Sequence, residues 1–215
     1  MKYCSSSYGF NSYLQFKRMI FNSYCLLHSV NLGRTQPLLA GGRKVLSGIG
    51  KRAVVGAVQV QHMGLVGDDV ADLSVHGGLD KAVYAYPAEH YAFWQAARRE
   101  QGVSLFDEAL PHGFMGENLT ITGLLEADVY VGDVLQFAQC VLRVTAPREP
   151  CFKFNAVMGF AAAAKLMVTE QRCGFYLSVV TPGELIAGEA FTLQSGQREL
   201  SVADAIWGKR AKHLR

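Results

Sequence analysis

Short strand-like runs, separated by turns that contain glycine, proline or aspartate, limit what this chain can fold into. Runs of Val, Leu, Tyr and Phe with partial period-two alternation recur from Val30 onward. In one of them Cys140, Leu142 and Val144 share a face, which predicts that Cys140 is a core residue. The pattern predicts a mainly β (α+β) fold. The expected strands are residues 54–60, 73–75, 82–86, 118–122, 128–137, 139–145, 174–181 and 189–194.

Two segments are predicted to form helices. Residues 88–101 follow Pro87, which suits the first position of a helix, and they place Tyr91 and Trp94 on one face. Asn155 can cap a second helix, which we expect to run without a break to about residue 169.

The charges are unevenly distributed along the chain. Eight of the 21 lysines and arginines precede Asp68, and no acidic residue does. Such a basic stretch could recruit an anion, whether phosphate, nucleic acid or acidic lipid, or it could be a solvated face. No recognition helix, zinc finger or aromatic ribonucleoprotein signature accompanies the charge, so we expect no nucleic-acid partner.

Length and composition favour a single domain. The 215 residues, half of them hydrophobic, are enough for one sizeable core and too few for two. No apolar run reaches the roughly 18 residues that a membrane span needs, so no span is expected. The five cysteines form no Cys-x-x-Cys pair and have no zinc-finger spacing, which indicates reduced thiols and a cytoplasmic location. Residues 1–28 lack an apolar signal segment and could be a transit peptide or an extended start.

Residues 147–155 contain a cysteine close to two cations and two prolines. Cys151 follows two prolines directly after a predicted strand, so a stiff turn would present its thiol. Arg148 and Lys153 are near neighbours, and positive charge lowers the pKa of a thiol toward the nucleophilic, metal-binding thiolate. The alternative is a small apolar residue that fills a gap, as cysteine often does. The prolines and cations favour a functional Cys151.

Three further segments suit a ligand. His76 and Lys81 flank two glycines that would allow close approach of a ligand, although a tight turn has the same pattern. Asn118 could hydrogen-bond a heterocycle or form a turn. Arg43 and Lys51 each follow glycines, a combination that suits a phosphate but lacks the P-loop pattern. The histidines that we interpret as structural or surface residues are His62, His90 and His112.

The order of the motifs resembles a known family. The segments that carry the resemblance are 41–43, 48–51, 64–68, 75–82, 86–91, 116–119, 131–133 and 147–153. Together they resemble the MOSC domain, the C-terminal domain of molybdenum-cofactor sulfurases, and are nearest to its small stand-alone bacterial members of the YiiM type. The resemblance extends from about Val30 to Ile206 and implies a β-barrel-like domain with peripheral helices.

The resemblance also implies a cofactor and a set of residues that hold it. Members of the family handle molybdenum bound to a pterin dithiolene, so molybdenum–molybdopterin is the expected cofactor. Cys151 would be the catalytic residue and the molybdenum ligand, which suits a soft thiolate. No lysine is marked as a Schiff-base former, so pyridoxal phosphate is not expected. The residues that would line the cofactor site are Lys51, His76, Lys81, Asn118, Arg148, Lys153 and Arg43.

Three functions follow from the resemblance. The one that we predict is a reductase of N-hydroxylated bases or amidoximes, which acts on a small N-hydroxylated substrate and takes electrons from an external reductase. The second is a sulfur carrier with a persulfide on Cys151. The third is a non-catalytic module that stores or delivers the cofactor.

Both ends of the chain depart from the family pattern. Residues 1–28 have no counterpart and are predicted to be an N-terminal extension, while residues 29–206 would form the MOSC domain. Stand-alone members continue into a three-helix tail, whereas residues 207–215 are predicted to be a short tail. The oligomeric state stays open.

Overall fold

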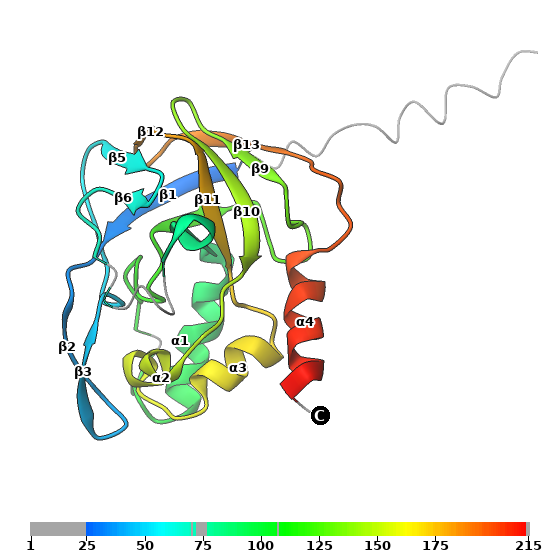
Figure 1. The fold of residues 1–215 in the computed structure, drawn as a ribbon. Coiled ribbons are helices and arrows are strands. Elements are labelled where there is room, and N and C mark those ends of the chain that lie inside the picture. The colour runs from blue at the N-terminus through cyan, green and yellow to red at the C-terminus, as the bar shows by residue number, and fades with distance from the viewer. Residues whose placement is uncertain (1–24, 70, 72–76, 107, 214–215) are drawn as a thin grey trace, which may run out of the picture.

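A closed barrel of seven strands forms the body of the protein in the computed structural model, which describes residues 25–69, 71, 77–106 and 108–213 (Figure 1). The strands neighbour one another in the order β13, β9, β10, β11, β7, β8 and β1, and pairing of β1 with β13 closes the ring. All neighbours are antiparallel except β7 and β8. The strands are β1 Cys25–Leu32, β7 Val83–Pro87, β8 Leu119–Thr122, β9 Val134–Gln136, β10 Val141–Pro147, β11 Phe175–Thr181 and β13 Ala190–Gln194.

Smaller elements surround the barrel. A separate hairpin of β2 Gln36–Ala40 and β3 Arg43–Ser47 lies beside it, and a three-stranded sheet joins β12 Gly183–Leu185 to β5 Val58–Gln61 and β6 Gly64–Leu65. The short strand β4 Arg52–Ala53 adds to β1. Helices gather at one end of the barrel (Figure 1). They are α1 Tyr91–Glu100, α2 Phe152–Met158, α3 Ala163–Thr169 and α4 Val202–His213, with 3-10 turns at Leu79–Lys81 and Ala88–His90.

The core joins α1 and α2 to the barrel through aromatic side chains. Trp94 is fully buried and donates its Nε1–H to the Tyr86 hydroxyl of β7. Its ring meets Phe154 of α2 edge-on, with the ring centroids 5.4 Å apart, an arrangement that aromatic pairs prefer. Tyr91 is also buried, so the apolar face predicted for the 88–101 helix is confirmed.

The mainly β fold with peripheral helices is confirmed, and Cys140 is a buried core residue as predicted. Two strand predictions are too long. A bend at Gly56 interrupts residues 54–60, of which only 58–60 are in a strand, and residues 128–137 contribute only β9. The strand expected at 73–75 lies outside the described residues.

The single helix predicted from Asn155 to residue 169 is wrong. Gly159, at φ +83°, ends α2, and α3 begins only at Ala163. Asn155 lies inside α2 and accepts a hydrogen bond from the Ala164 N–H at 2.7 Å, so it caps the second helix from the first. Pro87 is also misplaced by the prediction, because it ends β7 with ψ 125° and precedes a 3-10 turn rather than opening α1.

The ends of the described chain continue secondary structure. β1 begins at Cys25, so residues 25–28, which we assigned to the N-terminal extension, belong to this strand, and 25–27 pair with β8 or β13. α4 runs from Val202 to His213 and includes most of the segment assigned to the tail. Among the described residues, none of the helices is long and apolar enough to cross a membrane.

Gly174 fixes the approach of β11 to β7, so replacing it should destabilise the fold. Its φ is +64°, and a Cβ there would overlap the Ala85 carbonyl oxygen and approach the Tyr86 ring to 2.8 Å. We expect Gly174→Ala to lower the free energy of unfolding by more than about 2 kcal/mol in urea titrations. Gly42→Ala is the matched control, because its φ is also positive but nothing lies within 4 Å, and it should cost about 1 kcal/mol. Equal losses would contradict this reading.

Candidate functional site

An open cleft lies where the β2–β3 hairpin, the barrel strands β7 and β11, and the start of α2 meet. It encloses about 710 Å³, including the part that is open to solvent. Three lysines and one arginine line it, together with two tyrosines and one cysteine. The lining residues that the following paragraphs use are Ser47, Lys51, Asp68, Lys81, Tyr84, Gly116, Asn118, Arg148, Cys151, Lys153 and Tyr176.

Arg148 places a buried positive charge in the cleft wall. The residue is 7% exposed, and its guanidinium lies 5.3 Å from the Tyr84 ring centroid and 5.0 Å from that of Phe154. Its Nη1 contacts the thioether of Met167 at 3.1 Å. No carboxylate of the described residues pairs with it. Because aromatic faces and a thioether compensate a buried charge only in part, the geometry suits an anionic ligand at this point.

Cys151 lies beside Arg148, immediately before α2. Its backbone is extended, with φ −124° and ψ 177°, and its side chain is half-buried at the cleft. Burial lowers the pKa of Arg148, but the nearby Tyr84, Tyr176 and Cys151 groups outweigh that effect and raise it. Arg148 therefore stays charged next to the thiol.

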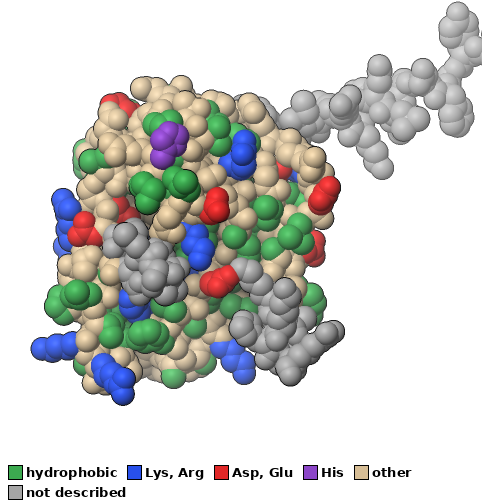
Figure 2. All heavy atoms as spheres, viewed as in Figure 1, with side chains coloured by type: hydrophobic (Ala, Val, Ile, Leu, Met, Phe, Trp, Pro, Cys, Tyr) green, Lys and Arg blue, Asp and Glu red, His purple; other side chains and the backbone are tan. Residues whose placement is uncertain are grey.

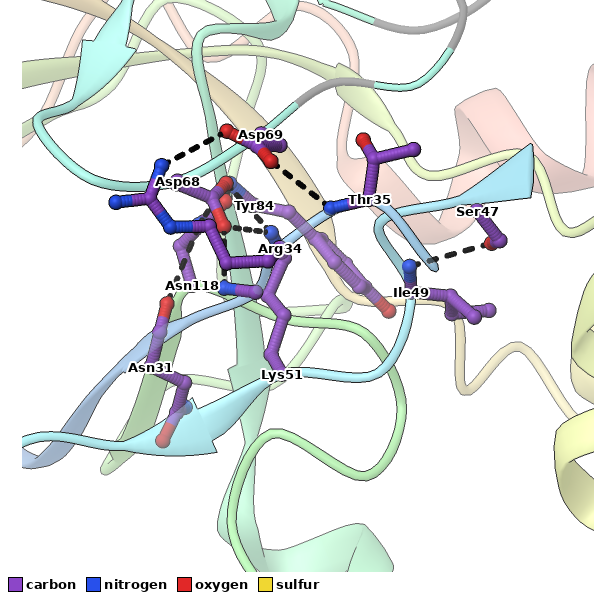
Figure 3. A network of polar contacts seen from close by, with 11 residues as sticks. Asn31, Arg34, Thr35, Ser47, Ile49, Lys51, Asp68, Asp69, Tyr84 and Asn118 are labelled. Carbon is purple, nitrogen blue, oxygen red and sulfur yellow. Dashed lines mark hydrogen bonds and ion pairs between the residues drawn. The ribbon is translucent and has the colours of Figure 1, made fainter. Parts of the chain in front are cut away.

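A polar network in the cleft lining joins segments that are distant in the sequence (Figure 3). The Asp68 carboxylate forms a buried ion pair with Lys51 and accepts hydrogen bonds from Asn118 Nδ2 and the Gly33 N–H, both at 2.8 Å. The Asn118 Oδ1 in turn accepts the Tyr84 N–H of β7 at 3.1 Å. The donors and the acceptor of the Asn118 carboxamide are thus already bonded within the protein.

Asp69, which also lines the cleft, secures the same loop. Its carboxylate accepts hydrogen bonds from the Thr35 N–H at 2.9 Å and from Arg34 at 3.2 Å (Figure 3). The Thr35 hydrogen bond is the main cause that lowers the pKa of Asp69, and the charge of Arg34 adds to it. Asp68 and Asp69 therefore hold the 67–69 turn against residues 33–35.

Two tyrosines form an apolar wall with protonated hydroxyl groups. Burial raises the pKa of both Tyr84 and Tyr176, while the charge of Arg148 opposes this rise. Their rings lie 5.6 Å apart, and the Lys81 ammonium stands 5.7 Å from the Tyr176 ring centroid. A flat ligand would find both a ring face and an O–H donor here.

The structure brings most of the predicted site residues together, and separates one. Those that line the cleft are Lys51, Lys81, Asn118, Arg148, Cys151 and Lys153. Lys153 also donates to the Leu46 carbonyl oxygen at 3.0 Å, which ties α2 to the hairpin. Arg43 does not line the cleft, because it is exposed at the first position of β3. His76 lies outside the described residues.

His62, His90 and His112 lie at structural or surface positions, as predicted. His90 is buried and lies 2.8 Å from a Glu126 carboxylate oxygen, and His62 bonds the Val179 carbonyl oxygen. The His112 ring meets the Tyr91 ring edge-on. Within the described ranges no group of three or more His, Cys, Asp or Glu is placed to hold a metal ion.

Sequence reasoning missed Asp68, Glu117 and the two tyrosines. Asp68 has the pattern of a turn residue, and nothing local shows that Lys51 and Asn118 converge on it. Glu117 is fully buried, which raises its pKa, and its Oε1 accepts hydrogen bonds from Tyr91, Gly113 and Thr120. It supports the turn that carries Asn118. Tyr84 and Tyr176 could have been found only from the strand pattern, because side chains alternate between the two faces of a strand and the two tyrosines pair across β7 and β11.

The fold and the site define a class of protein, a β-barrel domain whose cationic cleft has Cys151 in its wall. A family model described as the MOSC domain matches residues 72–192. The chain belongs to the MOSC domain family.

Comparison with individual proteins agrees with this assignment. YflK of Bacillus subtilis is 38% identical over 189 residues, which cover 86% of this chain and 82% of YflK. The crystal structure of YiiM from Geobacillus stearothermophilus matches with a TM-score of 0.68 and 28% identity over 89% of this chain and 86% of that one. A protein of Gibberella moniliformis named "Reductase" is 32% identical over 78% of this chain, which covers only 29% of that protein.

The Lys51–Asp68 pair should be critical for the cleft wall. Both side chains are less than a tenth exposed, so Asp68→Asn would leave a buried ammonium without its carboxylate. We expect the free energy of unfolding to fall by about 3–5 kcal/mol in urea titrations. Asp69→Asn is the control. The Arg34–Asp69 pair is exposed, so this substitution should lower the free energy of unfolding much less. Comparable losses for the two variants would show that the buried pair has no special role.

Proposed function

We propose that this protein is a molybdenum-cofactor-dependent reductase of N-hydroxylated bases or amidoximes. The observation that carries the proposal is the juxtaposition of Cys151 with Arg148, a buried cation that has no carboxylate partner in the described structure. A soft thiolate suits molybdenum, and a desolvated guanidinium suits the phosphate of a pterin cofactor.

The residues present fit such a cofactor. Arg148 and Lys81 would bind its anionic groups, and Lys51 would join them while it keeps the Asp68 pair. Cys151 would supply the protein's ligand to the metal, and the remaining ligands would come with the pterin. When bound, the cofactor would supply two electrons to the substrate.

The side chains of the cleft would position the substrate for N–O cleavage. In the overall reaction R–NH–OH, two electrons and two protons give R–NH₂ and water. Tyr84 and Tyr176 would pack against a planar base and exclude water from one side. The Tyr176 hydroxyl keeps its proton, because burial raises its pKa, and would donate a hydrogen bond to the substrate.

The comparisons support this proposal at the level of the family. The reductase of Gibberella moniliformis contains a segment similar to this chain, together with much additional sequence. An external reductase would provide the electrons. No disulfide joins the four cysteines that the structure describes, which suits the reducing cytoplasm.

The half-buried thiol at the cleft favours a second candidate, a sulfur carrier with a persulfide on Cys151. Such a carrier would hold the persulfide without a bound metal. Incubation with a cysteine desulfurase and cysteine, followed by mass spectrometry of Cys151, distinguishes the two candidates. A sulfur carrier should gain one sulfur atom on Cys151, whereas a reductase should gain none and needs none for turnover.

Replacement of Cys151 tests the reductase directly. With reduced viologen as electron donor, we expect cofactor-loaded wild-type protein to reduce an N-hydroxylated purine, and Cys151→Ser to lose at least about a hundredfold in rate because the metal loses its thiolate. Cys140→Ala, which removes a buried thiol from the core, should retain most of the activity. A cofactor-loaded wild type without activity would rule out the proposed function.

A further inference from the structure

The β2–β3 hairpin presents an apolar face that no other element of the described chain covers. Leu39 pairs with Lys44 and Pro37 pairs with Leu46, so these four residues share one side of the two-stranded sheet. All four are exposed, with Leu39 at 67% and Leu46 at 60%. Pro37, Leu39, Lys44 and Leu46 are called the hairpin face below.

The surroundings of the hairpin face are positively charged. Lys44 lies on it, Arg43 is adjacent, and residues 25–67 contain no Asp or Glu. Figure 2 shows lysine and arginine side chains at the lower left of the molecule, over this hairpin. An apolar centre with a basic rim complements a partner that has an acidic rim around an apolar contact.

The hairpin face adjoins the mouth of the cleft. Leu46 directly precedes Ser47, which lines the cleft, and its carbonyl oxygen accepts the hydrogen bond from Lys153. Phe152 follows Cys151 and is 53% exposed, so it adds apolar surface at the start of α2. A protein seated on the hairpin face would therefore lie beside the cleft that Cys151 lines.

We propose that the hairpin face docks an acidic electron-carrier protein of the flavodoxin type, which reduces the centre in the cleft. This inference rests on the proposed function. Each N–O bond that is cleaved consumes two electrons and two protons, so two reduced flavodoxins would each give one electron and be oxidised, while water supplies the protons. The hairpin face consists of four residues, so it suits a small, transient interface, as electron-transfer complexes have.

Two substitutions on the hairpin face test the proposal. Leu39→Glu and Lys44→Glu lie opposite each other and outside the cleft lining, so neither should change turnover with reduced viologen. With reduced flavodoxin at low salt, we expect each variant to lose about tenfold or more in rate, and the wild-type rate to fall as salt is added. Arg143→Glu is the matched control, because Arg143 is an exposed cation on β10 and should leave both rates unchanged.

The outcomes separate this inference from the proposed function. No turnover of the wild type with viologen would refute the proposed function. Turnover with viologen but not with flavodoxin, or flavodoxin rates that are equal in the wild type and both hairpin variants, would overturn the docking proposal alone. A loss in Arg143→Glu as large as in Lys44→Glu would also overturn it, because the effect would then be one of overall charge.

Discussion

The buried guanidinium of Arg148 is the interaction on which the architecture of the cleft depends. A charge that is almost removed from water must be compensated, and here the faces of Tyr84 and Phe154 and the Met167 thioether surround it without neutralising it. β7 and the helices α2 and α3 supply these groups, and Arg148 directly follows β10, so the barrel and the helices meet around one cation. An anionic ligand would complete the arrangement.

Elsewhere in the cleft lining, Asp68 balances the charge of Lys51 and accepts a hydrogen bond from Asn118. The other cations of the cleft lining are Arg148, Lys81 and Lys153. The buried charge of Arg148 beside Cys151 would orient a cofactor that has an anionic end and a metal. Tight backbone contacts maintain the spacing of the walls, as at Gly174, where a side chain would separate β11 from β7.

The sequence predicted six of the seven barrel strands, as in the 139–145 run and its buried Cys140, but it missed β1, part of which we assigned to the N-terminal extension. It also predicted the chemistry of residues 147–155, because Arg148, Cys151 and Lys153 are close in the chain. It could not predict that Asp68 binds both Lys51 and Asn118, since this contact joins segments that only the barrel brings together. It could not predict that Arg43 lies outside the cleft, because this depends on where the hairpin lies relative to the barrel. It also could not predict that Gly159 ends α2, because helix propensity does not indicate the left-handed backbone at this residue.

In the proposed function, Arg148 would hold an anionic molybdenum cofactor beside Cys151. The direct measurement is molybdenum per chain, by mass spectrometry of the element, in wild-type protein and Arg148→Met purified from a host that makes the cofactor. Methionine fills similar space without charge, so we expect about one molybdenum per wild-type chain and at least a tenfold lower content in the variant. Folded wild-type protein without molybdenum, or equal contents in the two proteins, would contradict the account.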